Sequence, residues 1–120
     1  RAAAGIGAIS DWLGEDLEPV DKPLSEHRAQ TCLLCPLNQL GNFWQRLEGA
    51  AAESLRSLVN AKNEMQLSTT IDAKLHSCTA CDCWLPLKVH TPIHHIKAHT
   101  SAETMARLWE KCWIRVELSA

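Results

Sequence analysis

The chain has 120 residues and a mass of 13.3 kDa, which is the size of a single domain. Residues 1–73 hold six basic and ten acidic residues and residues 74–120 hold six and four, so the chain lacks the strongly basic character of a general nucleic-acid binder. Its apolar runs are far shorter than the roughly 20 residues of a membrane span, and 46% hydrophobic residues argue against disorder. We therefore expect one folded domain over residues 1–120, without a membrane-spanning segment.

Two helices are expected before the first cysteines. The first covers residues 2–17, where apolar side chains recur at spacings of three and four, namely Ile6, Ile9, Trp12, Leu13 and Leu17. The second begins near Pro23, because proline suits the first position of a helix, and it runs toward Cys32. Its last turn would then carry the first cysteine pair.

The clearest helical pattern runs from Arg46 to about Met65. Its apolar residues fall on one face, which is typical of core packing: Leu47, Ala51, Leu55, Leu58 and Val59. Aromatic residues are scarce, with one Phe and no Tyr beside five Trp. We therefore expect another source of stability beside the burial of hydrophobic side chains. We expect a small core built from Trp12, Trp44, Leu55, Leu58, Leu108 and Trp109.

Three short elements are expected in the C-terminal third. One helix starts at Thr91-Pro92, and a second starts at Thr100, because Thr100 and Glu103 have the spacing of a capping box. The second helix would place four residues on one side: Met105, Leu108, Trp109 and Cys112. The tail from Trp113 to Leu118 alternates apolar and polar residues, which is typical of a short strand. The predicted fold class is mainly α, a small helical domain stapled by metal knuckles, with the C-terminal strand as an option.

Six cysteines form the strongest motif. Two CxxC pairs are present, Cys32/Cys35 and Cys78/Cys81, and Cys83 and Cys112 follow the second pair. Two residues between cysteines allow a tight turn that directs both sulfurs at one ion, and two such turns supply the four thiolates of a zinc site. The simplest ligand set is therefore Cys32, Cys35, Cys78 and Cys81, within a metal core over residues 24–114 and with Cys83 as the nearest substitute. The 42 residues between the pairs exceed the spacing of a zinc ribbon, so a helical insertion is expected there.

The cysteine pattern leaves alternatives to one zinc ion. An iron–sulfur cluster also takes four thiolates, and Cys35-Pro36 resembles the Cys-Pro of bacterial ferredoxins, although those proteins space their cysteines more tightly. Buried thiols and a disulfide framework are further alternatives. Because six cysteines exceed one tetrahedral site, Cys83 and Cys112 either replace a CxxC member, join His90 in a second site, or share bridging sulfurs in a binuclear centre.

Histidines near the second cysteine group suggest a weaker, catalytic reading. His90, His94, His95 and His99 recur at spacings that suit a metal with an open position. No HExxH motif is present, and no acidic residue lies among these histidines to serve as a general base, so surface or capping roles compete. His76 is a candidate ligand or a hydrogen-bond donor to one. The sequence leans away from an enzyme.

Three blocks carry a resemblance to known proteins: residues 28–38 (RAQTCLLCPLN), residues 78–90 (CTACDCWLPLKVH) and residues 112–113 (CW). They resemble RAxxCxxCPxN, CxxCxCxLxxKVH and CW in a group of small cysteine-rich proteins of phages and prophages. Trp84 and Pro86 depart from that pattern, where Pro and Lys are common. The resemblance implies that all six cysteines belong to one pattern, which favours a shared or binuclear metal centre, and it implies a phage or bacterial cytoplasmic setting.

The expected function is a non-enzymatic, zinc-stapled interaction module in the bacterial cytoplasm, in a chain of bacterial or phage origin. Its partner is expected to be a protein, with nucleic acid as the other option through a set of basic residues: Lys88, Lys97, Arg107, Lys111 and Arg115. The alternative function is an iron–sulfur protein for electron transfer or redox sensing. The oligomeric state stays open.

Overall fold

The structure is a computed structural model that describes Trp12 and residues 18–39, 49–80 and 83–119. In chain order, the elements of this part are α2 (Lys22–Leu34), β1 (Asn38–Gln39), α3 (Gly49–Glu64), η2 (Asp72–Lys74), β2 (Ser77–Cys78), α4 (Leu85–Lys88), α5 (Ile93–Ala98), α6 (Ala102–Arg107) and α7 (Trp113–Ser119). The prediction of a small, mainly α fold is confirmed. Among the described helices, none combines the length and the apolar character that crossing a membrane requires.

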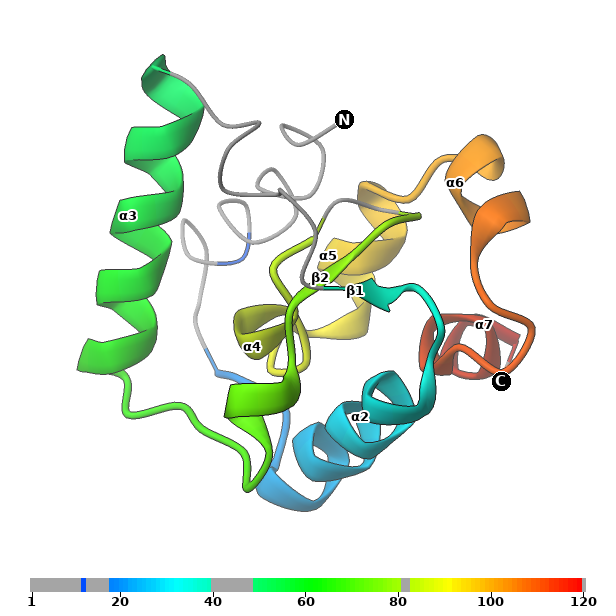
Figure 1. Ribbon diagram of the computed structural model, residues 1–120, viewed down its shortest axis with the longest axis horizontal. Coiled ribbons are helices and arrows are strands. Elements are labelled where there is room, and N and C mark those ends of the chain that lie inside the picture. Colours follow the sequence, from blue (N-terminus) through cyan, green and yellow to red (C-terminus); the bar gives the residue numbers. More distant parts are fainter. Residues whose placement is uncertain (1–11, 13–17, 40–48, 81–82, 120) are drawn as a thin grey trace.

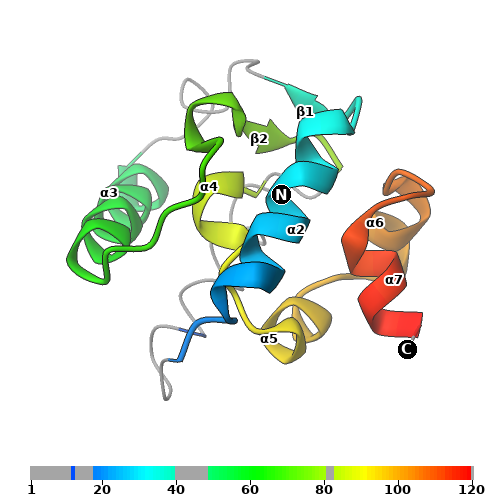
Figure 2. The ribbon, with the colours of Figure 1, turned by 90° about the horizontal axis from the view of Figure 1, so that it is seen from below.

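The shortest elements lie in the middle of the molecule. In both ribbon views, α3 lies on one side and α6 and α7 on the other, with α2, α4 and the two strands between them (Figures 1 and 2). β1 and β2 pair antiparallel, with Asn38 opposite Cys78 and Gln39 opposite Ser77. This pairing joins the chain before α3 to the chain after it.

Helix α2 confirms the helix expected near Pro23, with its first residue at Lys22. The carboxylate of Asp21 caps the helix by accepting a hydrogen bond from the backbone N–H of Leu24 at 3.0 Å. Its buried residues recur at spacings of three and four: Ser25, Arg28, Ala29 and Cys32. Two of these side chains are polar, so hydropathy alone does not identify the buried face.

Helix α3 confirms the helix expected between the cysteine pairs, although Trp44, Leu47 and the side chains of Leu55 and Leu58 lie outside the described residues. The described part of its predicted apolar face is Val59, which is half-buried. The helix expected over residues 2–17 also lies outside the described residues, apart from Trp12, which is helical and fully buried.

Three expectations for the C-terminal third are corrected, while the helix after Thr91-Pro92 is confirmed as α5. The cap of α6 is Ser101 rather than Thr100, because Thr100 donates its hydroxyl to the carbonyl of Ile96 at the end of α5. Helix α6 ends at Arg107, so it does not carry the four residues expected on one side. The tail forms helix α7 instead of a strand.

The helical tail has a physical reason. In α7 the adjacent residues Trp113 and Ile114 are both buried, and Glu117, one helical turn beyond Trp113, reaches the guanidinium of Arg28. A strand would send Trp113 and Ile114 to opposite faces. Tertiary contacts therefore override the alternating pattern.

The core of the described part lies between α2, α4, α5 and α7, and its buried residues are Ala29, Cys32, Leu75, Cys78, Ala80, Leu85, Val89, Ile96, Leu108, Trp113 and Ile114. Of the expected core, Trp12 and Leu108 are confirmed as buried, and Trp109 is half-buried. Two cysteines, Cys32 and Cys78, belong to this core, and the partly buried Cys112 packs against it.

Candidate metal centre

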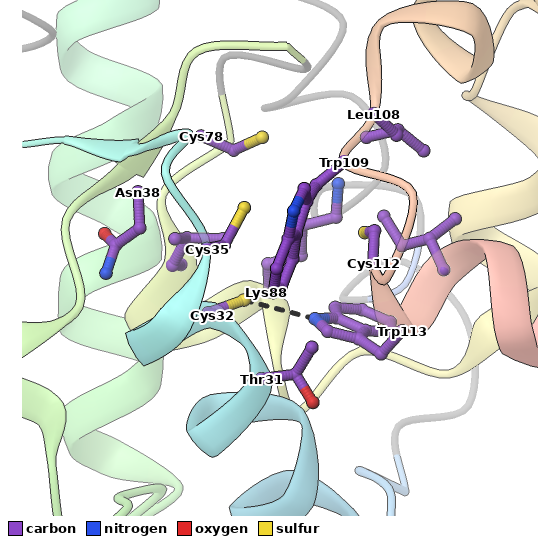
Figure 3. Close-up of a pocket in the computed structure, with 12 residues that line it drawn as sticks. Thr31, Cys32, Cys35, Asn38, Cys78, Lys88, Leu108, Trp109, Cys112 and Trp113 are labelled. Carbon is purple, nitrogen blue, oxygen red and sulfur yellow. Dashed lines mark hydrogen bonds between the residues drawn. The ribbon is translucent and has the colours of Figure 1, made fainter.

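Four cysteines from three separate segments line one cavity. Cys32 and Cys35 come from the end of α2, Cys78 from β2, and Cys112 from the residue before α7. Figure 3 shows Cys32, Cys35 and Cys78 on one side of the cavity and Cys112 beside Trp113 on the other. The cavity has a volume of about 20 Å³, which suits one water-sized or single-ion occupant. The other lining residues are Thr31, Asn38, Leu85, Lys88, Leu108, Trp109, Trp113 and Ile114.

The first cysteine pair forms the tight turn that its spacing predicts. The N–H of Cys35 donates to the carbonyl of Cys32 at 3.1 Å, and the N–H of Asn38 donates to the carbonyl of Cys35 at 3.2 Å. The N–H of Leu37 donates to the sulfur of Cys35 at 3.4 Å. A backbone donor aimed at the sulfur fixes its position, and contacts of this kind orient metal ligands.

The strand pair brings Cys78 to this turn. Asn38 is paired with Cys78, and its side chain also ties the two segments together by donating to the carbonyl of Lys74 at 3.0 Å and accepting from the N–H of His76 at 2.8 Å. The N–H of Thr79 donates to the carbonyl of Leu37 at 3.0 Å. Backbone pairing and the side chain of Asn38 therefore bring Cys78 next to the turn that holds Cys32 and Cys35, although the two segments lie far apart in the sequence.

Arg115 fixes the loop that carries Trp109 and Cys112. Its guanidinium donates to the carbonyls of Met105, Leu108 and Trp109, with distances of 2.9 Å to Leu108 and 3.2 Å to Trp109. Cys112 directly precedes α7, and its carbonyl accepts hydrogen bonds from the N–H groups of Arg115 and Val116 in that helix. The loop and the helix together place Cys112 at the cavity.

Trp113 links α7 to Cys32 and Arg28 of α2. Its indole N–H donates to the sulfur of Cys32 at 3.2 Å, shown as the dashed line in Figure 3. The guanidinium of Arg28 lies 4.3 Å from the centre of the Trp113 ring, and it donates to Glu117 at 2.6 and 2.8 Å. Arg28 is fully buried and also donates to the carbonyls of Val89 and Thr91, so one side chain joins α2, α7 and the turn after α4.

Burial controls the ionisation of Cys32. It raises the pKa of the Cys32 thiol to about 12, while the Trp113 hydrogen bond lowers the pKa. Among the smaller contributions to this value, the charges of Cys112 and Cys35 raise the pKa and the charge of Lys88 lowers it. A positive charge in the cavity therefore favours the thiolate that a metal requires.

Cys83 does not line the cavity beside Cys78. Cys83 is buried and accepts a hydrogen bond from the Nζ of Lys88 at 2.8 Å, and Cys81 lies outside the described residues. Within residues 18–39, 49–80 and 83–119, no three His, Cys, Asp or Glu side chains are gathered closely enough to hold an ion as they stand. Binding at the four cavity cysteines would require their sulfurs to move inward.

The candidate histidines are split between different environments. His90 and His95 are buried, whereas His94 and His99 are exposed. His90 lies in the turn after α4 and His94 lies on α5, so this pair does not share a helical face, whereas His95 lies on α5 and His99 is the residue that ends it. His76 is half-buried and contributes its backbone N–H to Asn38.

Two of the five basic residues expected to contact nucleic acid are engaged inside the fold. Lys88 is buried beside Cys83, and the guanidinium of Arg115 donates to three carbonyls. Lys97, Arg107 and Lys111 are exposed. The expected basic surface is therefore reduced to three residues of the original five.

The roles of Arg28, Asn38 and Trp113 were missed by reasoning from the cysteines alone, although these residues lie in the same sequence blocks as the cysteines. Comparisons of the chain with protein-family models, with curated proteins and with solved structures found no match.

Proposed function

We propose that the protein is a non-enzymatic interaction module whose fold is cross-linked by one zinc ion bound to Cys32, Cys35, Cys78 and Cys112. The observation that carries this proposal is the convergence of these four cysteines on one cavity from three segments. Sulfur is the donor that zinc prefers in structural sites, and four thiolates complete its tetrahedral shell. Hydrogen bonds to the sulfurs of Cys32 and Cys35 are of the kind that orients metal ligands.

The donor set favours a structural role over catalysis. A zinc ion that is saturated by four protein ligands has no open position for water or substrate, whereas catalytic zinc sites keep one. The surface of the folded module would then carry the function, which is the binding of a partner. We propose that the protein partner contacts two exposed apolar side chains, Leu34 of α2 and Val116 of α7, which are 75% and 63% exposed. We also propose that the module acts in a bacterial or phage-infected cell.

Elemental analysis of the purified protein tests the metal proposal. The expected result is about one zinc ion per chain, lost in Cys32→Ser and Cys112→Ser. Iron with visible absorbance in anaerobic preparations would instead establish an iron–sulfur protein, which the same hydrogen bonds to sulfur would also suit. Protein without zinc or iron, and with its thiols reactive in the native fold, would overturn both readings.

The surface proposal has its own test. Partners captured from a bacterial lysate by the wild-type chain should be lost with the double variant Leu34→Asp and Val116→Asp, while its zinc content stays unchanged. A salt-dependent mobility shift with nucleic acid, abolished by substitution of Lys97, Arg107 and Lys111, would identify the other class of partner.

A further inference from the structure

Lys88 is a buried lysine at the edge of the cysteine cluster. Its side chain lines the cavity together with Cys32, Cys35, Cys78 and Cys112, and the residue is 3% exposed. It closes α4, a single turn in which all four residues are buried. Lysine is almost never fully buried unless it is paired, so this position calls for a compensating group.

One group that contacts the ammonium of Lys88 is a cysteine sulfur. The Nζ of Lys88 donates to the Sγ of Cys83 at 2.8 Å, and Cys83 is itself 3% exposed. Cys83 does not line the cavity. Backbone pairing holds Cys83 in place, because the N–H of Cys78 donates to its carbonyl at 3.1 Å. The ammonium group thus contacts a sulfur that lies outside the cavity, while the side chain of Lys88 forms part of the cavity wall.

The electrostatics of the proposed site need such a cation. A zinc ion with four thiolates is net negative, and a buried negative charge is costly unless a positive charge or hydrogen bonds compensate it. Lys88 lowers the pKa of Cys32, so its charge already acts on one of the cavity cysteines.

We propose that Lys88 is the charge partner of the metal centre and that Cys83 holds Lys88 in position instead of binding the metal. This inference rests on the proposed zinc site. Among the five described cysteines, it divides the sulfurs by role: four bind the ion, and Cys83 anchors the lysine.

The test is a titration of the metal-free protein with Co²⁺, whose visible absorption reports sulfur ligands and tetrahedral geometry. Lys88→Met should bind Co²⁺ about 10- to 100-fold more weakly than the wild type, the loss typical when a group supporting metal ligands is removed. It should keep the wild-type spectrum and one ion per chain. Lys88→Arg should recover most of the affinity, and the exposed control Lys97→Met should match the wild type.

Cysteine variants in the same titration separate the sulfurs that bind the ion from the sulfur that holds Lys88. Cys83→Ser should keep one ion per chain and the four-sulfur spectrum, because serine still accepts a hydrogen bond from Lys88, whereas Cys112→Ser should lose them. A Cys83→Ser variant that loses the ion or changes the spectrum would show that Cys83 is a ligand and would overturn the inference. Unchanged affinity in Lys88→Met would overturn it as well.

The outcomes also separate this inference from the proposed function. If the wild type takes up no Co²⁺ or Zn²⁺, the proposed function fails and the inference fails with it. If the wild type is loaded but the Lys88 and Cys83 variants behave contrary to expectation, the zinc site stands and the inference alone fails. Should circular dichroism show Lys88→Met to be unfolded, the affinity of Lys88→Arg and the stoichiometry of Cys83→Ser decide.

Discussion

His90 is a buried histidine whose Nε2 atom has no hydrogen-bond partner in the part of the chain that the structure describes. Its pKa is lowered from 6.5 to about 4, mainly by burial; the charge of Asp72 raises the pKa, and the charges of Lys62, Lys22 and Arg28 lower it. As the pH falls below 6.5, the unfolded chain takes up this proton first, and the folded chain takes it up only near pH 4. The contribution of neutral His90 to the free energy of unfolding is therefore complete above pH 6.5, and it is lost progressively as the pH falls toward 4.

Replacing His90 tests this residue directly. Between pH 7 and pH 5, the free energy of unfolding of the wild type should fall by about 2 kcal/mol more than that of His90→Gln. The reason is that each pH unit below 6.5 costs about 1.4 kcal/mol while only the unfolded chain is protonated at His90. Urea unfolding at both pH values measures the difference. Identical pH dependence in the wild type and the variant would show that His90 does not titrate in this way.

At the scale of single residues, the sequence predicts side chains that follow the hydrophobic pattern better than polar side chains with tertiary roles. Trp12 and Leu108 are buried as expected from their place in apolar stripes. Lys88 is one of the basic residues of the nucleic-acid option, but it is buried against Cys83. Its burial depends on the position of a cysteine five residues earlier and of the cavity behind it, and neither is visible in a hydropathy pattern.

At the scale of elements, the contact between α2 and α7 depends on Arg28. Its guanidinium forms a two-pronged ion pair with Glu117, donates to two carbonyls and lies over the ring of Trp113. Arg28→Met should destabilise the protein by about 3–5 kcal/mol, because it leaves the carboxylate of Glu117 and two carbonyls without their partner. Thermal or urea unfolding measures this loss.

The matched control is Arg56→Met, which alters an exposed arginine on α3 and should change the stability by no more than about 0.5 kcal/mol. A loss below about 1 kcal/mol in Arg28→Met would mean that the contact between α2 and α7 is held by apolar packing alone.

Long or capped elements were predictable, and short ones were not. Pro23 and the apolar spacing of residues 46–65 indicate α2 and α3, both of which the structure contains. The strands β1 and β2 have two residues each, which is too short for any periodic signal. Helix α7 was mistaken for a strand, because alternation over six residues fits both structures until Arg28 and the core fix the orientation of Trp113.

At the scale of the molecule, a bound ion would join the end of α2, strand β2 and the start of α7. The spacing of the CxxC pairs predicts sites for metal, but it does not predict that Cys112 would line the cavity, because that depends on the packing of α7 against α2. The tight turn at Cys32 and Cys35 follows from sequence. Sequence names Cys112 as one of two candidates to replace a CxxC member, and only the fold shows that Cys112, and not Cys83, lines the cavity.

Removing the ion should loosen all three segments. We expect a chelator to lower the melting temperature of the zinc-loaded protein by about 15 °C, because saturating binding contributes about 4 kcal/mol at a free ion concentration 1,000-fold above Kd. Calorimetry with and without chelator measures the change, and readdition of Zn²⁺ should restore it. Cys32→Ser should melt at the same temperature with or without chelator. A wild type that is equally insensitive would show that the cysteines stabilise the fold without metal.

X-ray absorption at the zinc edge of the loaded protein tests the central claim most directly. Four sulfur neighbours at about 2.3 Å are expected, without nitrogen or oxygen neighbours at bonding distance. Cys112→Ser should replace one sulfur by a lighter atom or lose the zinc, and Cys83→Ser should leave all four in place. A wild-type shell with fewer than four sulfurs, or with histidine nitrogen in it, would contradict the closed four-cysteine centre.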